Sequence, residues 1–72
     1  MMKTIFVFLA DGFEEIEAIT PIDVLRRAGL NVQTVSVMDK QTVSGAHSIP
    51  VVADKMFADI HFEDAEMLLL PG

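Results

Sequence analysis

The stretch KTIFVFL, residues 3–9, decides the fold class of this chain. It is continuously apolar after Thr4 and rich in β-branched and aromatic side chains, which is typical of a strand covered on both faces. Such strands occur mainly in parallel sheets, where crossover helices lie over the sheet. The stretch therefore predicts an α/β protein built on a parallel sheet.

Acidic residues mark the start of a helix directly after this strand. Asp11 and Gly12 interrupt the apolar run, and three glutamates follow: Glu14, Glu15 and Glu17. Carboxylates are stabilised at the positive end of the helix dipole. The simplest interpretation of all three is dipole complementarity on a solvated first turn.

The end of this helix is marked by basic residues and a glycine. Arg26 and Arg27 suit the negative end of the dipole, and Gly29 stands where a left-handed cap is common. We therefore expect a helix over residues 15–28. Residues 31–38 follow as a second strand, which completes a right-handed strand–helix–strand unit.

Pro21 lies four residues after Glu17 and lacks the N–H that would bond to the Glu17 carbonyl. We expect the helix to kink or restart there. Equally, Thr20 could cap a second helical segment that begins at Pro21, with Asp23 in its first turn. Both interpretations place an irregularity beside Glu17, near the carboxyl end of the first strand, where open parallel sheets bind ligands.

The second half of the chain predicts shorter elements. Residues 42–43 and 49–52 resemble short strands that flank a turn at Ser44 and Gly45, and Pro50 suits only an edge strand. Residues 59–65 predict a loop or a single helical turn, and residues 67–70 predict another buried parallel strand.

The composition excludes several classes of protein. Eleven acidic against five basic residues give a net charge of −6, which argues against nucleic-acid binding. The longest apolar run, residues 5–10, is too short to span a bilayer, and the acids after it interrupt a signal peptide, so we expect a soluble cytoplasmic protein. Phosphate-loop glycines are absent, and His47 and His61 lack a third ligand, so we expect no cofactor and no metal.

With these elements in place, the chain resembles the ThiJ/PfpI family from end to end. The resemblance is carried by GFEEIE at residues 12–17, PIDVLRRAG at 21–29, the hairpin at 44–53 and LLPG at 69–72. It implies a flavodoxin-like, doubly wound parallel sheet sandwiched by helices (class I glutamine amidotransferase-like). One helix would leave a sheet face bare, so we expect residues 1–72 to be the N-terminal portion of a single larger domain.

The resemblance also implies site residues. Glu17 matches the family glutamate that hydrogen-bonds a reactive cysteine beyond this sequence, and Gly72 matches the first glycine of the L-P-G-G loop. Glu14 is a candidate for the pocket rim. His47 stands where several relatives carry arginine, so we expect it to attract an anionic group while protonated. Ile16 is expected at a homodimer contact.

Family members are named as deglycases, glyoxalases, intracellular proteases or thiazole monophosphate biosynthesis proteins. The resemblance therefore implies a cysteine-dependent hydrolase or lyase that acts on small reactive carbonyls or glycated adducts. An alternative is a non-catalytic redox sensor or chaperone of the same fold. A flavodoxin-like cofactor-binding module is the weakest hypothesis, because the first strand–helix turn lacks a hydroxyl-rich phosphate nest.

Overall fold

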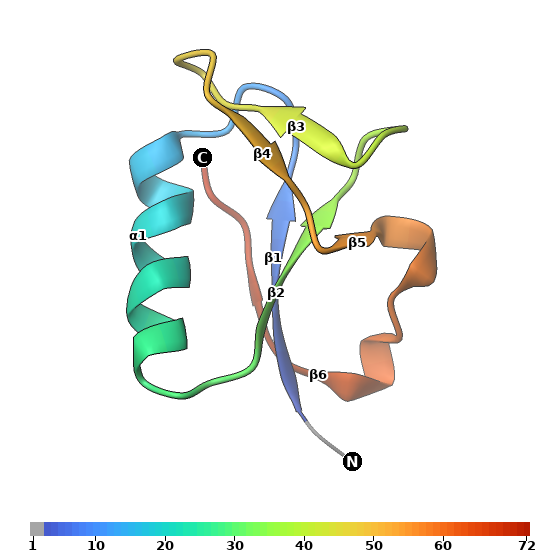
Figure 1. Cartoon of the computed structure of the whole chain (residues 1–72). Helices are drawn as coiled ribbons and strands as arrows, with labels where there is room; N and C mark the ends of the chain where they lie inside the picture. Colours follow the sequence, from blue (N-terminus) through green and yellow to red (C-terminus); the bar gives the residue numbers. More distant parts are fainter. Residues whose placement is uncertain (1–2) are drawn as a thin grey trace.

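The computed structural model of the protein describes residues 3–72 and contains one α-helix, six strands and two short 3₁₀ helices in this part of the chain (Figure 1). In chain order the elements are β1 (Thr4–Leu9), α1 (Glu15–Arg27), β2 (Val32–Ser36), β3 (Thr42–Ser44), β4 (Pro50–Val52), β5 (Lys55–Met56), η1 (Phe57–Asp59), η2 (Phe62–Asp64) and β6 (Ala65–Leu69).

Four of the strands form one parallel sheet in the order β5-β2-β1-β6. Ile5 lies opposite Val32 of β2 and Met67 of β6, so β1 is a central strand with parallel neighbours on both sides. The predicted parallel sheet is therefore confirmed, and the arrangement is that of an α/β, flavodoxin-like fold. The two-residue strand β5, which pairs with β2, was too short to be predicted.

The two faces of β1 are covered by different parts of the chain. Ile5, Val7 and Leu9 belong to the main hydrophobic cluster, together with Ala18 and Ile22 of α1. Phe8 points to the opposite face, where its ring lies 6.0 Å from that of Phe57 and 6.3 Å from that of Phe62. Figure 1 shows α1 on one side of the sheet and the η1–η2 segment on the other.

A Schellman motif ends α1 at the predicted place. The N–H of Gly29 donates to the carbonyl of Arg26, and the N–H of Leu30 donates to the carbonyl of Leu25. Gly29 has a φ of 85°, a conformation that side chains with a Cβ rarely adopt. The chain can therefore turn directly from α1 toward β2.

Pro21 does not divide the helix. One α-helix runs from Glu15 to Arg27 with Pro21 inside it, so the expected restart and the second cap at Thr20 are wrong. Pro21 removes a single hydrogen bond, to the carbonyl of Glu17, while burial of Ala18 and Ile22 holds the helix against the sheet. Beside Glu17, Pro21 therefore leaves one helix carbonyl without its usual N–H donor.

The last strand is less covered than its sequence predicts. β6 pairs with β1 alone among the described residues, and Met67 and Leu68 are 47% and 44% exposed. The prediction of a buried strand is therefore wrong for residues 3–72, because an edge position leaves these side chains without neighbours on one side. A loop or one helical turn was predicted over residues 59–65, and the structure has two short 3₁₀ helices here, η1 over residues 57–59 and η2 over residues 62–64.

The predicted hairpin is confirmed. β3 and β4 pair antiparallel, with Val43 opposite Val51, and form a separate two-stranded sheet above the carboxyl end of β1 (Figure 1). Pro50 lies in an edge strand, as expected. Within residues 3–72 no helix has both the length and the apolar character that crossing a membrane requires.

Candidate functional site at the carboxyl ends of β1 and β6

Two hydrogen bonds join Gly72, which follows β6, to residues at the start of α1. The N–H of Glu14 donates to the carbonyl of Gly72 at 2.6 Å, and the N–H of Gly72 donates to Oε1 of Glu17 at 3.1 Å. The residues that make these bonds follow β1 and β6, which are neighbouring parallel strands. The carboxyl ends of such strands are the usual place for ligand sites in open α/β sheets. The structure thus brings Glu14, Glu17 and Gly72 together.

Two hollows adjoin this junction. A cavity of about 410 Å³ is lined by aromatic and aliphatic side chains and by the loop after β1: Phe8, Ala10, Asp11, Gly12, Phe13, Val37, Phe57, Phe62, Leu70, Pro71 and Gly72. A smaller hollow of about 180 Å³, beside the end of β6, is lined in part by Glu17 and Pro21. Glu17 therefore lies at the edge of the site with its carboxylate directed to the backbone of Gly72.

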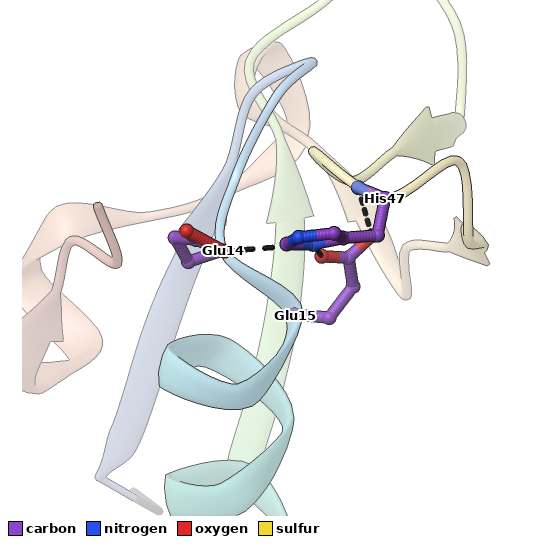
Figure 2. Close-up of side chains that lie close together, drawn as sticks. All are labelled: Glu14, Glu15 and His47. Atoms are coloured by element: carbon purple, nitrogen blue, oxygen red, sulfur yellow. Dashed lines mark hydrogen bonds and ion pairs between the residues drawn. The ribbon is translucent and has the colours of Figure 1, made fainter.

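A second cluster lies on the other side of Glu14, where the hairpin meets the start of α1. Glu15 is the first residue of α1, and its side chain is only 9% exposed. Its Oε1 lies 2.9 Å from Nδ1 of His47, and its Oε2 accepts the backbone N–H of His47 at 2.8 Å. Figure 2 shows the His47 ring between the carboxylates of Glu14 and Glu15; Oε1 of Glu14 is 3.7 Å from Nδ1.

These contacts change the titration of both partners. Burial of Glu15 acts to raise its pKa, but hydrogen bonds from the His47 ring and from backbone N–H groups, including that of Ile49, outweigh burial and lower the pKa from 4.5 to about 2. Conversely, the hydrogen bond to Glu15 and the negative charges of Glu15 and Glu14 raise the pKa of His47 above its ordinary 6.5.

Gly45 is required by the close approach of the Glu15 carboxylate to the hairpin. A Cβ at Gly45 would collide with the carboxylate of Glu15. The absence of a side chain at this position lets the carboxylate reach the backbone of the turn. The GFEEIE motif and the hairpin glycine are thus parts of one contact.

The donor atoms of Glu14, Glu15 and His47 all lie within 4.8 Å of one another, a spacing that a metal ion could bridge. The Glu15 carboxylate already accepts backbone N–H groups and faces the His47 ring. Both of its oxygens are therefore occupied by hydrogen bonds to the hairpin turn. The sequence pattern suggested only His47 and His61 as a possible ligand pair. It did not reveal the cluster of Glu14, Glu15 and His47, because no local signal relates Glu15 to a residue 32 positions later.

Comparison with known proteins identifies the family. Residues 3–72 match the DJ-1/PfpI family. The chain belongs to this family. DJ-1 homolog B of Arabidopsis thaliana is 39% identical over 70 residues, which cover 97% of this chain and 16% of that protein.

Two solved structures of DJ-1 proteins superpose closely on the chain. A cysteine-to-alanine mutant of a DJ-1 superfamily protein from Salmonella typhimurium is 40% identical with a TM-score of 0.86, over 99% of this chain and 38% of that one. Oxidized Toxoplasma gondii DJ-1 is 37% identical with a TM-score of 0.91, over 97% of this chain and 38% of that one. The chain thus spans well under half the length of these relatives.

In this DJ-1/PfpI chain, the predicted site residues lie at two separate places. Glu14, Glu17 and Gly72 meet at the strand ends. His47 does not line the apolar cavity; it lies against Glu15 in a separate hollow of about 260 Å³ that also contains Ile16 and Ile49. Glu14 lies between the two groups.

A further polar centre was missed by sequence reasoning. Oδ2 of Asp54 accepts the backbone N–H of Thr34 at 2.9 Å, the Thr34 hydroxyl at 3.1 Å and Nη2 of Arg26 at 2.8 Å. It therefore connects α1, β2 and the segment between β4 and β5. This is a structural connection at the opposite end of the hairpin from His47.

Proposed function

We propose that the complete protein is a cysteine-dependent enzyme that acts on small reactive carbonyls or glycated adducts, with Glu17 as a catalytic residue. The observation that carries this proposal is the hydrogen bond from the N–H of Gly72 to Oε1 of Glu17, which fixes a carboxyl group at the carboxyl ends of two parallel strands. The chain itself contains no cysteine, so the nucleophile would come from a further part of a single domain.

The chemistry follows from the position of the carboxyl group. A protonated Glu17 would donate a hydrogen bond to a cysteine sulfur and set the reactivity of the thiolate. The thiolate would attack the carbonyl carbon, forming a C–S bond while the carbonyl π electrons move to oxygen. Gly72 and Glu14 would shape the pocket beside the reacting atoms.

His47 is proposed at the outer rim, where it would attract an anionic substrate group. Its side chain is 71% exposed even with Nδ1 directed to Glu15, so the rest of the ring faces solvent. The contribution would be present below the raised pKa of His47 and would fade above it.

The second candidate function is a redox sensor or chaperone whose cysteine is oxidised reversibly without turnover. The structure of Toxoplasma gondii DJ-1 is of the oxidized protein, and this observation favours the alternative. A cysteine beside Glu17 would suit either chemistry, because both depend on thiolate character.

One experiment separates the two candidates. The full-length protein is given an α-oxoaldehyde, and aldehyde consumption is followed beside a variant with the nucleophilic cysteine changed to serine. Catalytic consumption that the variant lacks supports the enzyme. Stoichiometric peroxide oxidation with no aldehyde turnover supports the sensor and contradicts the enzyme.

We further propose that the full-length protein is a cytoplasmic homodimer with Ile16 at the contact. Ile16 is 78% exposed, and the hollow beside it contains the exposed Ile49 of the hairpin turn. Apolar side chains exposed together at one place are typical of an interaction surface. Cell fractionation would test the cytoplasmic location, and sedimentation velocity would test the dimer.

A further inference from the structure

The backbone N–H groups of the hairpin turn at residues 45–49 that bond outside the hairpin do so to one carboxylate and one carbonyl. Oε2 of Glu15 lies 2.8 Å from the backbone nitrogen of His47 and 3.4 Å from that of Ile49. The N–H of Ala46 donates to the carbonyl of Phe13 at 2.8 Å. Glu15 at the start of α1 and Phe13, two residues before it, therefore supply the hydrogen-bond partners of the turn from outside the hairpin.

The remaining amides of the turn are bonded within it. The N–H of Ser48 donates to the carbonyl of Gly45, and the N–H of Gly45 donates to the carbonyl of Ile49, each at 3.0 Å. Ser48 has a φ of 64°, as expected for the last residue of a three-residue hairpin loop. The turn is thus a small preformed unit whose attachment to α1 depends on Glu15.

The single titratable group of the turn faces that attachment. Nδ1 of His47 is 2.9 Å from Oε1 of Glu15 and 3.7 Å from Oε1 of Glu14. Residues 42–52 contain no other charged side chain. From the loop after β1, Asp11 accepts the N–H of Ser44 at 3.1 Å, so the charged groups around the turn are three carboxylates and His47.

We propose that Glu15 and His47 form a pH-dependent latch, which holds the hairpin turn on the start of α1 tightly when His47 is protonated and more weakly when His47 is neutral. The protonated ring adds an ion pair to the backbone hydrogen bonds that Glu15 accepts. Loss of the proton leaves those backbone bonds in place and removes the charge. This inference does not depend on the proposed function.

Linkage makes the latch quantitative. If the turn opens to a state in which His47 titrates normally, each pH unit by which Glu15 raises the His47 midpoint equals about a tenfold difference in latch strength between the two protonation states. The midpoint and the strength of attachment are therefore two independent measurements of one quantity.

The test uses NMR on the full-length protein. The imidazole signals of His47 give its titration midpoint, and hydrogen exchange, corrected for the intrinsic pH dependence, gives the protection of the Ala46, His47 and Ile49 amides on both sides of that midpoint. We expect protection to fall above the midpoint by the factor that linkage requires. Amides of Gly29 and Leu30, at the far end of α1, report whether the whole fold changes.

Variants isolate the pair. Glu15→Gln should lower the His47 midpoint toward 6.5 and remove the pH dependence of protection in the turn. His47→Asn leaves the Glu15 carboxylate intact and should show weak, pH-independent protection, which keeps the test valid if Glu15→Gln folds poorly. Glu63→Gln, which removes a carboxylate from an exposed pair with His61, is the control and should leave the His47 midpoint unchanged.

Two results would overturn the latch. One is a wild-type turn whose protection is the same above and below the His47 midpoint. The other is a His47 midpoint that Glu15→Gln leaves unchanged in a folded variant, since the geometry then has no energetic consequence for the histidine.

Discussion

The backbone N–H of Gly72 donates a hydrogen bond to Oε1 of Glu17, 3.1 Å away, and ties the end of β6 to the beginning of α1. A Cβ at Gly72 would lie 2.8 Å from the same oxygen, so a glycine fits this contact best. Glu17 is therefore positioned by the neighbouring strand end as well as by its own helix.

Replacing Glu17 tests the proposed catalytic role in the full-length protein. Glu17→Gln keeps an oxygen acceptor for the N–H of Gly72 but removes the acid, so turnover should fall by about 100-fold or more and the thiolate titration of the cysteine should shift. Glu17→Ala should do the same and also loosen the end of β6. Glu63→Gln is the exposed control. Unchanged thiol titration in both Glu17 variants would remove this residue from the site.

Ile16→Ser tests the proposed dimer contact. Because a two-fold interface contains the residue twice, and burying an isoleucine is worth about 1.5–3 kcal/mol, the dissociation constant should rise by about 100-fold or more. Sedimentation velocity over a dilution series measures this change. Val24→Ser, at an exposed apolar position two turns further along α1, is the control. A wild-type protein that sediments as a monomer at every concentration would contradict the contact.

Glu15 should contribute to stability above pH 4.5, and this contribution should be lost as the pH falls toward 2. The direction follows because the pKa is about 2 in the folded chain and 4.5 when unperturbed, so acid unfolding requires protonation of a hydrogen-bonded carboxylate. Glu15→Gln should lower the midpoint of urea unfolding at pH 7 and flatten its decline between pH 4.5 and 2. Parallel profiles for both proteins would show that the contact adds no pH-dependent stability.

Gly45→Ala should destabilise the protein by about 1–3 kcal/mol, because the new methyl group collides with the Glu15 carboxylate. The double variant Gly45→Ala, Glu15→Ala separates this collision from any other effect at Gly45. Chemical denaturation of the four proteins gives the coupling energy. Additive losses would mean that the two residues do not oppose each other.

Asp54→Ala should cost about 1–3 kcal/mol, because it leaves the N–H of the buried Thr34 without its carboxylate acceptor. Asp23→Ala is a matched control: it also removes an aspartate paired with an arginine of α1, here Arg27 at 2.9 Å, but in an exposed i,i+4 pair worth a few tenths of a kcal/mol. Equal losses in thermal denaturation would show that the bonds to Thr34 carry no stability.

The sequence predicted those features that depend on local signals. The apolar run before Asp11, the acids that start α1 and the glycine that ends it act within a few residues, and the structure confirms the elements they predict. The contact between Glu17 and Gly72 joins distant positions. The rule that ligands bind at the carboxyl ends of parallel strands suggested that both residues lie at one edge of the sheet, and the family resemblance assigned both to one site. The role of that site stays a prediction.

What the sequence could not predict was set by tertiary contacts. The continuity of α1 through Pro21 depends on burial of Ala18 and Ile22 against the sheet, which outweighs one lost hydrogen bond. The pair of Glu15 with His47 exists because the hairpin folds over the start of the helix. Dipole complementarity explained Glu15 as a solvated acid, whereas the structure buries it.

The central position of β1 has a consequence for the time course of folding. Its two neighbours are made at very different times during vectorial synthesis: Val32 opposite Ile5 comes early, and Ala65 opposite Thr4 comes near the end of the described chain. The β1–α1–β2 unit can therefore form on the ribosome while the other edge of β1 is still open, and β6 joins after closure of a much longer loop. If β6 pairs after the β1–α1–β2 unit has formed, changes in β6 should alter the unfolding rate more than the folding rate, which stopped-flow kinetics would measure.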